Sequence, residues 1–116
     1  TSMHVFEFIA DIEKTVANLS SRLTKEGMFC FAVHKPVYLN KNTKHDTVSN
    51  GLVFDLAGQE VPVFCRTEKY YENMMRKYGL KNLSWHWPEY SASFKAKHNI
   101  DKNTDGWAMI GIFEKD

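Results

Sequence analysis

The sequence lacks an excess of charge of either sign, because 15 lysine and arginine residues stand against 14 aspartate and glutamate residues. The basic residues are scattered along the chain, so no surface is predicted to collect phosphates, and nucleic acid is not an expected partner. No apolar run approaches the roughly 18 residues that a membrane span needs, and the N-terminus lacks the order of a signal peptide. These absences predict a cytoplasmic protein without a membrane partner.

Cysteine is also scarce, and both cysteines, Cys30 and Cys65, lie in apolar, strand-like runs. A free cysteine in such a run behaves as a small buried hydrophobe, so a disulfide framework is not expected. The histidines and cysteines have none of the spacings typical of zinc ligands, and we expect no metal. No nucleophile elbow or related signature of nucleophilic catalysis is present.

What is present is the composition of one ordinary soluble domain over residues 1–116, with 43% hydrophobic and 25% charged residues. Apolar residues at spacings of three and four predict an amphipathic helix over residues 8–25, which a left-handed Gly27 would end. The following run "MFCFAVHKP" begins with six apolar residues and no polar alternation. It predicts a strand that is covered on both faces and ends at Pro36.

The second half of the chain predicts a hairpin, a helix and two strands. The hairpin is "GLVFDLAGQEVPVFC", and the helix would begin at Thr67 as its N-cap and end at Gly79. Alternation in "LKNLSWHWP" predicts a strand with Leu83, Trp85 and Trp87 on one face, and "GWAMIGIFEKD" predicts the last strand. The polar segments 37–51 and 91–106 are expected to be flexible loops.

This order of helix, strand, hairpin, helix, strand and strand resembles the C-terminal half of class I S-adenosylmethionine-dependent methyltransferases. The matching features are the edge "TSMHVFEFI", a strand that follows Gly27 and ends near "FAVHKP", and a helix start at Arg66-Thr67 followed by Tyr70 and Tyr71. The endings "GLKNLSWHWPEYS" and "GWAMIGIFEK" are closest to the toxoflavin synthase-like branch. The resemblance covers nearly the whole chain and implies an α/β, Rossmann-like fold with a mixed sheet.

The cofactor half of that family has no counterpart in this sequence. Such enzymes hold S-adenosylmethionine with a glycine-rich turn after the first strand and an acidic residue at the end of the second. The six glycines here are scattered and form neither GxGxxG nor GxGxG. We therefore interpret the chain as the substrate-side fragment of a complete enzyme, inactive alone, or as a natural remnant with another role. A fragment that begins at the fourth strand would expose a sheet edge, which predicts a homo-oligomer.

The resemblance implies that residues after the fourth strand contact the cofactor in the complete enzyme, namely Ser2, Met3, His4 and Phe6. His34 is a candidate contact to the methyl acceptor because it ends a strand, and Arg66 is another because its donors suit a carboxylate, carbonyl or phosphate. Four aromatic residues could wall a pocket for a planar substrate: Tyr38, Tyr70, Trp87 and Tyr90. No general base is identified.

Two functions from different classes follow. The first is methyl transfer to a small molecule, for which this chain would supply the acceptor side. The second is a non-catalytic domain that binds a small aromatic ligand or a partner through a face formed by Trp85 and Trp87. A glycine-rich strand–turn–helix upstream in the gene would favour the first.

Overall fold

Residues 1–35, 49–103, 106 and 108–116 are described by the computed structural model. Four strands form one sheet in the order β1-β2-β6-β5: β1 (Ser2–Met3), β2 (Met28–His34), β6 (Ala108–Lys115) and β5 (Leu80–His86). Strand β1 pairs with β2 in parallel, and β6 lies antiparallel to both β2 and β5. The predicted α/β fold with a mixed sheet is therefore confirmed.

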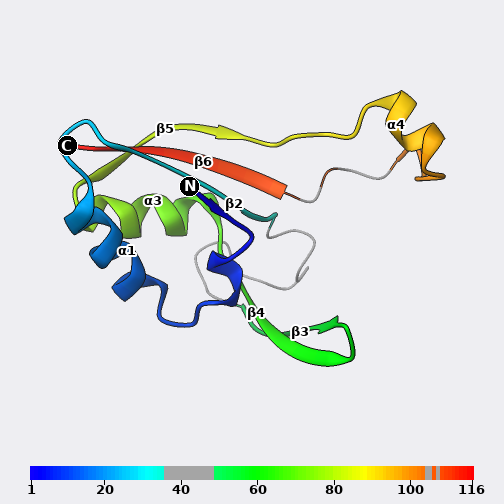
Figure 1. Cartoon of the computed structure of the whole chain (residues 1–116), viewed down its shortest axis with the longest axis horizontal. Coiled ribbons are helices and arrows are strands. Elements are labelled where there is room, and N and C mark those ends of the chain that lie inside the picture. Colours follow the sequence, from blue (N-terminus) through cyan, green and yellow to red (C-terminus); the bar gives the residue numbers. More distant parts are fainter. Residues whose placement is uncertain (36–48, 104–105, 107) are drawn as a thin grey trace.

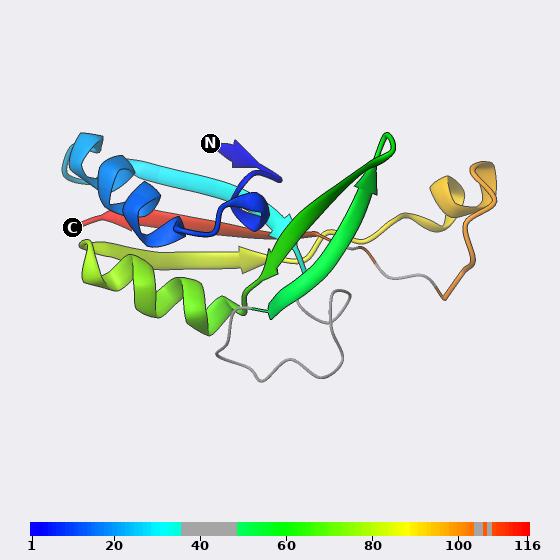
Figure 2. The same ribbon diagram turned by 90° about the horizontal axis from the view of Figure 1, so that it is seen from below.

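Helices α1 (Ile12–Arg22) and α3 (Glu68–Lys77) lie on one face of this sheet (Figures 1 and 2). Phe29 and Phe31 of β2 are buried with the apolar side chains of both helices, whereas Cys30 is only partly buried. On the other face of β2, Ala32 is buried, Cys30 and His34 are partly buried and Met28 is exposed, so the predicted coverage of both faces is only partial. None of the helices in the described part of the chain has the length and apolar character to cross a bilayer.

The first helix is shorter than predicted. A 3₁₀ turn, η1 (Phe6–Phe8), precedes it, and Asp11 caps α1 by accepting a hydrogen bond from the backbone N–H of Lys14. The left-handed residue near its end is Glu26, with φ of 65°, and not Gly27. Gly27 has a different reason to be glycine, because a Cβ there would lie 2.8 Å from the carbonyl oxygen of Thr24.

The second helix and the hairpin follow the prediction. Thr67 caps α3 through its hydroxyl, and Gly79, with φ of 74°, allows the chain to leave the helix. Strands β3 (Ser49–Leu56) and β4 (Gln59–Cys65) form an antiparallel hairpin. Its two turn residues, Ala57 and Gly58, both have positive φ, as a tight two-residue hairpin turn requires.

The two segments predicted as flexible loops have different outcomes. Residues 36–48 lie outside the described part of the chain, and residues 49–51 belong to β3. Within 91–106, Ser91 caps a short helix, α4 (Ala92–Lys97), by accepting a hydrogen bond from the N–H of Phe94. The loop prediction is wrong there because polar composition hid a helix start.

A bulge in β5 changes which residues share a face. Asn82 pairs with Phe113, but Ser84 pairs with the next residue of β6, so Leu83 is the extra residue. Leu83 is 46% exposed, whereas Trp85 packs against the buried core. The prediction that both residues lie on one face is therefore wrong, because a bulge reverses the alternation beyond it.

At the end of the sheet where β6 finishes, three side-chain and backbone groups form a polar cluster. Nζ of Lys115 donates to Oγ of Ser20, at 2.5 Å, and to the carbonyl oxygen of Tyr78, at 2.9 Å. The Ser20 hydroxyl also donates to that carbonyl. This lysine cluster ties α1, the end of α3 and β6 together.

Candidate functional site

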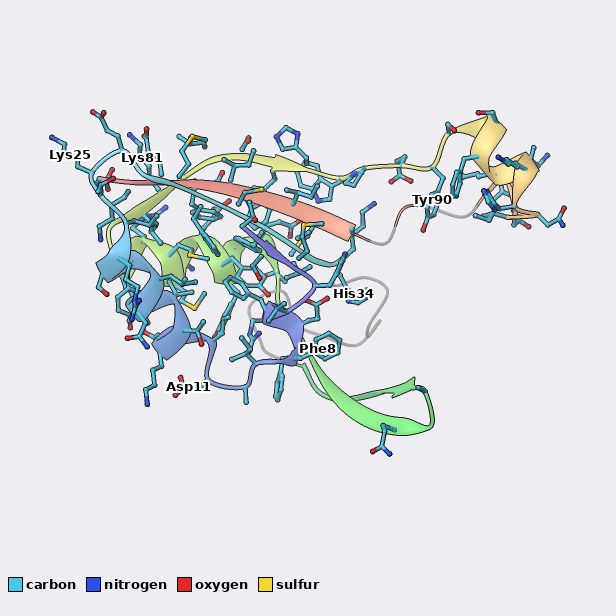
Figure 3. All side chains as sticks on the ribbon, viewed as in Figure 1. Phe8, Asp11, Lys25, His34, Lys81 and Tyr90 are labelled. Carbon is cyan, nitrogen blue, oxygen red and sulfur yellow. The ribbon has the colours of Figure 1, made fainter. Side chains whose placement is uncertain are left out.

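The opposite end of the sheet carries a cluster of ionisable side chains. His4 directly follows β1, Glu7 lies in η1 and His34 ends β2. Oε1 of Glu7 is 2.9 Å from Nδ1 of His4 and 2.8 Å from Nδ1 of His34. The two imidazole centroids are 5.1 Å apart. We call these three residues the His–Glu cluster; Figure 3 shows its member His34 at the end of β2, beside η1.

Backbone geometry places the cluster. Because β1 and β2 are parallel, their C-terminal ends meet at the same edge of the sheet, where open α/β sheets bind ligands. His4 has φ of 51°, a left-handed conformation that is uncommon outside glycine, although histidine is among the residues that tolerate it best. Its N–H donates to the carbonyl oxygen of Ala32 at 2.8 Å. The chain therefore turns sharply from β1 into η1, and this turn brings His4 onto Glu7.

Arg66 holds the segment that carries Glu7. Its side chain is 1% exposed, and its guanidinium donates to the carbonyl oxygens of Phe6 (2.8 Å), Ile9 (2.6 Å) and Ala10 (3.3 Å). Arginine suits this task because its donors form a rigid planar fork. Arg66 was predicted to contact the acceptor, but its terminal nitrogens donate to backbone carbonyls, which gives it a positioning role.

Glu7 is an ionised, buried carboxylate. Glu7 is 1% exposed, and burial by itself would raise the pKa of its carboxyl. Hydrogen bonds from His34, from its own backbone and from His4, together with the charge of His34, outweigh burial and lower this pKa below its ordinary value of 4.5. Oε2 of Glu7 is buried and has no hydrogen-bond partner among the described residues.

The donor atoms of the His–Glu cluster lie within 4.8 Å of one another, and two imidazoles with one carboxylate can also bind a divalent cation. Sequence spacing gave no sign of this, because Glu7 was not a candidate and His34 is distant in the chain. The one available signal was a histidine and a glutamate three residues apart, His4 and Glu7, between apolar neighbours.

The residues predicted to contact the cofactor lie in three different environments. Ser2 and Met3 form β1 at the edge of the sheet, where Met3 is 62% exposed. His4 belongs to the His–Glu cluster. Phe6 is 2% exposed, with its ring centroid 5.2 Å from that of Phe31, so its side chain belongs to the core and does not face a ligand.

The aromatic candidates do not gather around His34. Tyr70 packs against the core, and its ring centroid lies 6.0 Å from that of Tyr71. Trp87 is 48% exposed and donates from Nε1 to Glu68 at 3.2 Å. Tyr90 stacks on Phe94 of α4, and Figure 3 shows it well separated from His34. The remaining candidate lies outside the described residues: Tyr38.

No protein-family model matches the chain, and no curated protein matches its sequence. Solved structures do match. A putative S-adenosylmethionine dependent methyltransferase from Listeria monocytogenes superposes with a TM-score of 0.73 and 17% identity over 98% of this chain. A second, from Mesorhizobium loti, has a TM-score of 0.70 and 13% identity over 97%. A third, from Clostridium acetobutylicum, has a TM-score of 0.63 and 14% identity over 98%.

These matches establish the fold. The chain has the α/β fold of class I S-adenosylmethionine-dependent methyltransferases over the part that it covers. It spans 59%, 59% and 56% of the length of the three solved proteins. Sequence identities below one fifth support the same fold but do not show that the chain catalyses the same reaction.

Proposed function

We propose that this chain forms the acceptor side of an S-adenosylmethionine-dependent methyltransferase that acts on a small molecule. The observation that carries the proposal is the placement of the His–Glu cluster at the C-terminal ends of β1 and β2, in a fold shared with three proteins described as such enzymes. Ligands of open α/β sheets bind at this edge. We propose that the chain is related to the toxoflavin synthase-like branch, because its C-terminal third carries motifs similar to those of that branch.

The residues of β1 fit one side of the cofactor. Ser2, Met3 and His4 lie at the edge of the sheet, and Met3 presents an exposed thioether side chain there. S-adenosylmethionine, when bound, supplies a methyl group on a sulfonium. The glycine-rich turn that would hold its other side does not occur among the six scattered glycines of this sequence. These residues would therefore form one wall of the cofactor site.

The acceptor would be held from the other side of the His–Glu cluster. The His34 side chain is 14% exposed, enough to touch a ligand while Glu7 holds its ring. Methyl transfer is an in-line displacement, so alignment of the acceptor and exclusion of water are the main tasks of the protein. We keep Trp87 as a proposed acceptor contact because its indole is half-exposed just after the end of β5.

The second function, binding through a shared tryptophan face, loses its structural basis. The Trp85 ring packs edge-on against Phe31 and Phe113, with centroids 5.8 and 5.7 Å away, whereas Trp87 points to Glu68. Since one indole is occupied by the core, the two do not form a common ligand platform. Self-association through the outer edge of β1, which pairs with no other strand among the described residues, remains our proposal for the isolated chain.

The proposed function is tested with the full product of the gene that encodes this chain. The protein is incubated with S-adenosylmethionine labelled in its methyl group and with a fractionated extract of small molecules from the source cells. We expect label in a small-molecule product and formation of S-adenosylhomocysteine. Failure of the full product to bind S-adenosylhomocysteine at all would contradict the proposal.

A further inference from the structure

We propose that His4 is the proton acceptor for methyl transfer, that Glu7 and His34 hold it in the required state, and that the acceptor is a neutral compound with an N–H or O–H group. This inference rests on the proposed function, because it assigns the chemistry of the same site. It is carried by the geometry of the His–Glu cluster, in which both imidazoles meet one carboxylate oxygen.

The contacts fix the position of the protons. An ionised carboxylate can only accept hydrogen bonds, so a neutral imidazole that touches it must carry its proton on the touching nitrogen. In His4 that nitrogen is Nδ1, which forms a hydrogen bond of 2.9 Å with Oε1 of Glu7, while Nδ1 of His34 lies 2.8 Å from the same oxygen. When the His4 ring is neutral its lone pair is then on Nε2, which is the arrangement of an imidazole oriented by a carboxylate to act as a base.

Exposure and backbone geometry favour His4 over His34 as the base. The His4 side chain is 28% exposed and that of His34 is 14% exposed. His4 is also the residue with the left-handed backbone, and such strain is characteristic of functional positions. Nδ1 of His34 lies 2.8 Å from the same oxygen of Glu7, so this ring helps to hold the carboxylate in place while His4 takes a proton.

The surrounding charges are compatible with this division of roles. Arg66 donates to the backbone carbonyls of Phe6, Ile9 and Ala10, where it fixes η1. Lys35, next to His34 in the chain, forms its ion pair with Glu89 at 2.8 Å. Within the described residues, Glu7 is therefore the carboxylate that the two imidazoles share.

The role of His4 indicates the class of acceptor. In the balanced step, the electron pair of the acceptor nitrogen or oxygen forms the bond to the methyl carbon, and the carbon–sulfur bond breaks with its pair on sulfur. The acceptor's proton passes to Nε2 of His4, and the carboxylate of Glu7 stabilises the imidazolium. A carboxylate or thiolate acceptor has no proton to lose and would not need this arrangement, so an amine or a hydroxyl is favoured.

The tautomers are measured by NMR on the 116-residue chain labelled with ¹⁵N in its histidines. Near pH 8 we expect His4 and His34 to carry their proton on Nδ1, and we expect Glu7→Gln to abolish this preference. The exposed His86, whose Nε2 is 3.0 Å from Oγ of Ser84, serves as the internal reference and should not change. A His4 ring protonated on Nε2 in the wild-type chain would overturn the proposal.

Chemical reactivity separates a base from a structural ring. Diethyl pyrocarbonate acylates unprotonated imidazole nitrogens, and mass spectrometry locates the product. We expect His4 to react faster than His34, and the matched variant His34→Asn to leave the site of reaction at His4. Protection of His4 with reaction at His34 would overturn the assignment. Stoichiometric binding of Zn²⁺ at micromolar concentration, with loss of both Nδ1–H signals, would also overturn it and indicate a metal site.

These measurements do not require methyl transfer, so failure of the inference and failure of the proposed function are distinguishable. If the full gene product transfers methyl groups, Glu7→Gln should lower kcat more than it raises KM for the acceptor. An unchanged kcat would overturn the role of Glu7 even if the methyltransferase reaction is established.

Discussion

The two ends of the sheet carry polar clusters that satisfy their hydrogen bonds in different ways. In the lysine cluster, Lys115 donates to the Ser20 hydroxyl and to the carbonyl of Tyr78, and Ser20 donates to the same carbonyl, so a backbone acceptor ends the network. In the His–Glu cluster, two ionisable rings converge on Glu7, and one oxygen of that carboxylate has no partner among the described residues.

This difference separates a structural cluster from a candidate functional one. Polar groups that only hold a fold are expected to be fully paired, since an unpaired buried group costs free energy. Groups whose protonation states depend on one another are characteristic of functional sites. The lysine cluster is fully paired, as expected for a structural cluster. The His–Glu cluster has interdependent ionisable groups, as expected for a functional site, although both clusters lie at ends of the same sheet.

The largest effect on stability is expected at Arg66, which holds the backbone segment that carries Glu7. Arg66→Met removes donors from the carbonyls of Ile9 and Ala10 and one of two donors from that of Phe6, which keeps the N–H of Ile9, and we expect it to lower the free energy of unfolding by about 4 kcal/mol, at ~1–3 kcal/mol for each unsatisfied group. Lys115→Met is the matched change at the other end and should cost about 1 kcal/mol, because Ser20 still donates to Tyr78. Urea denaturation measures both, and equal losses would contradict the positioning role of Arg66.

The second largest difference in stability is expected between the two tryptophans, because Trp85 packs against the core and Trp87 is half-exposed. Trp85 packs against Phe31, Tyr71 and Phe113, so Trp85→Ala should lower the free energy of unfolding by about 3 kcal/mol. Trp87→Ala removes a half-exposed ring and should cost less than about 1 kcal/mol. Thermal unfolding compares the two variants, and similar melting temperatures would show that the two indoles have similar environments.

A smaller effect is expected where β6 passes beneath Trp85. A Cβ on Gly111 would lie 2.8 Å from the Trp85 ring and 3.0 Å from those of Phe31 and Phe113. Gly111→Ala should therefore destabilise the chain by about 1–3 kcal/mol through overpacking. Combining it with Trp85→Phe should recover part of the loss in a double-mutant cycle, because the smaller ring leaves room for the methyl group. Strict additivity would argue against contact between the two positions.

The smallest effect concerns acid sensitivity, which should differ between the two ends. The pKa of Glu7 is lowered in the folded chain, so its contribution to stability is present above the ordinary value of 4.5 and is lost as pH falls below it. Glu7→Gln should weaken the dependence of unfolding free energy on pH in this acidic range, whereas Lys115→Met should leave it unchanged. Denaturation at several pH values below neutrality measures the slopes, and identical slopes for wild type and Glu7→Gln would contradict the assignment.

Local signals in the sequence predicted most of the fold. The Thr67 cap, the left-handed Gly79 and the turn before Gln59 depend on neighbouring residues, and each is confirmed. The bulge at Leu83 was missed because it is a property of the pairing between β5 and β6 and leaves no composition signal. Ser91 was a readable cap that the polar surroundings of α4 obscured.

The candidate site was only partly predictable, for a physical reason. His34 could be proposed because it ends a predicted strand, and His4 only because the family resemblance implied it; the structure brings the two together. Glu7 could not be proposed from the sequence, since its burial depends on the sharp turn at His4. The role of Arg66 could not be predicted either, because its carbonyl partner Phe6 is 60 residues away in the chain. Contacts of that range are set by tertiary packing and not by local pattern.

We propose that this chain is the acceptor side of a methyltransferase and that other parts of the enzyme hold most of the cofactor. Isothermal titration calorimetry of S-adenosylhomocysteine into the 116-residue chain and into the full gene product tests it directly. Because β1 offers one wall only and binding must offset lost translational and rotational freedom, we expect no measurable binding to the chain and clear binding to the full product. A dissociation constant for the chain tighter than roughly 100 μM, about −5.5 kcal/mol, would contradict the account.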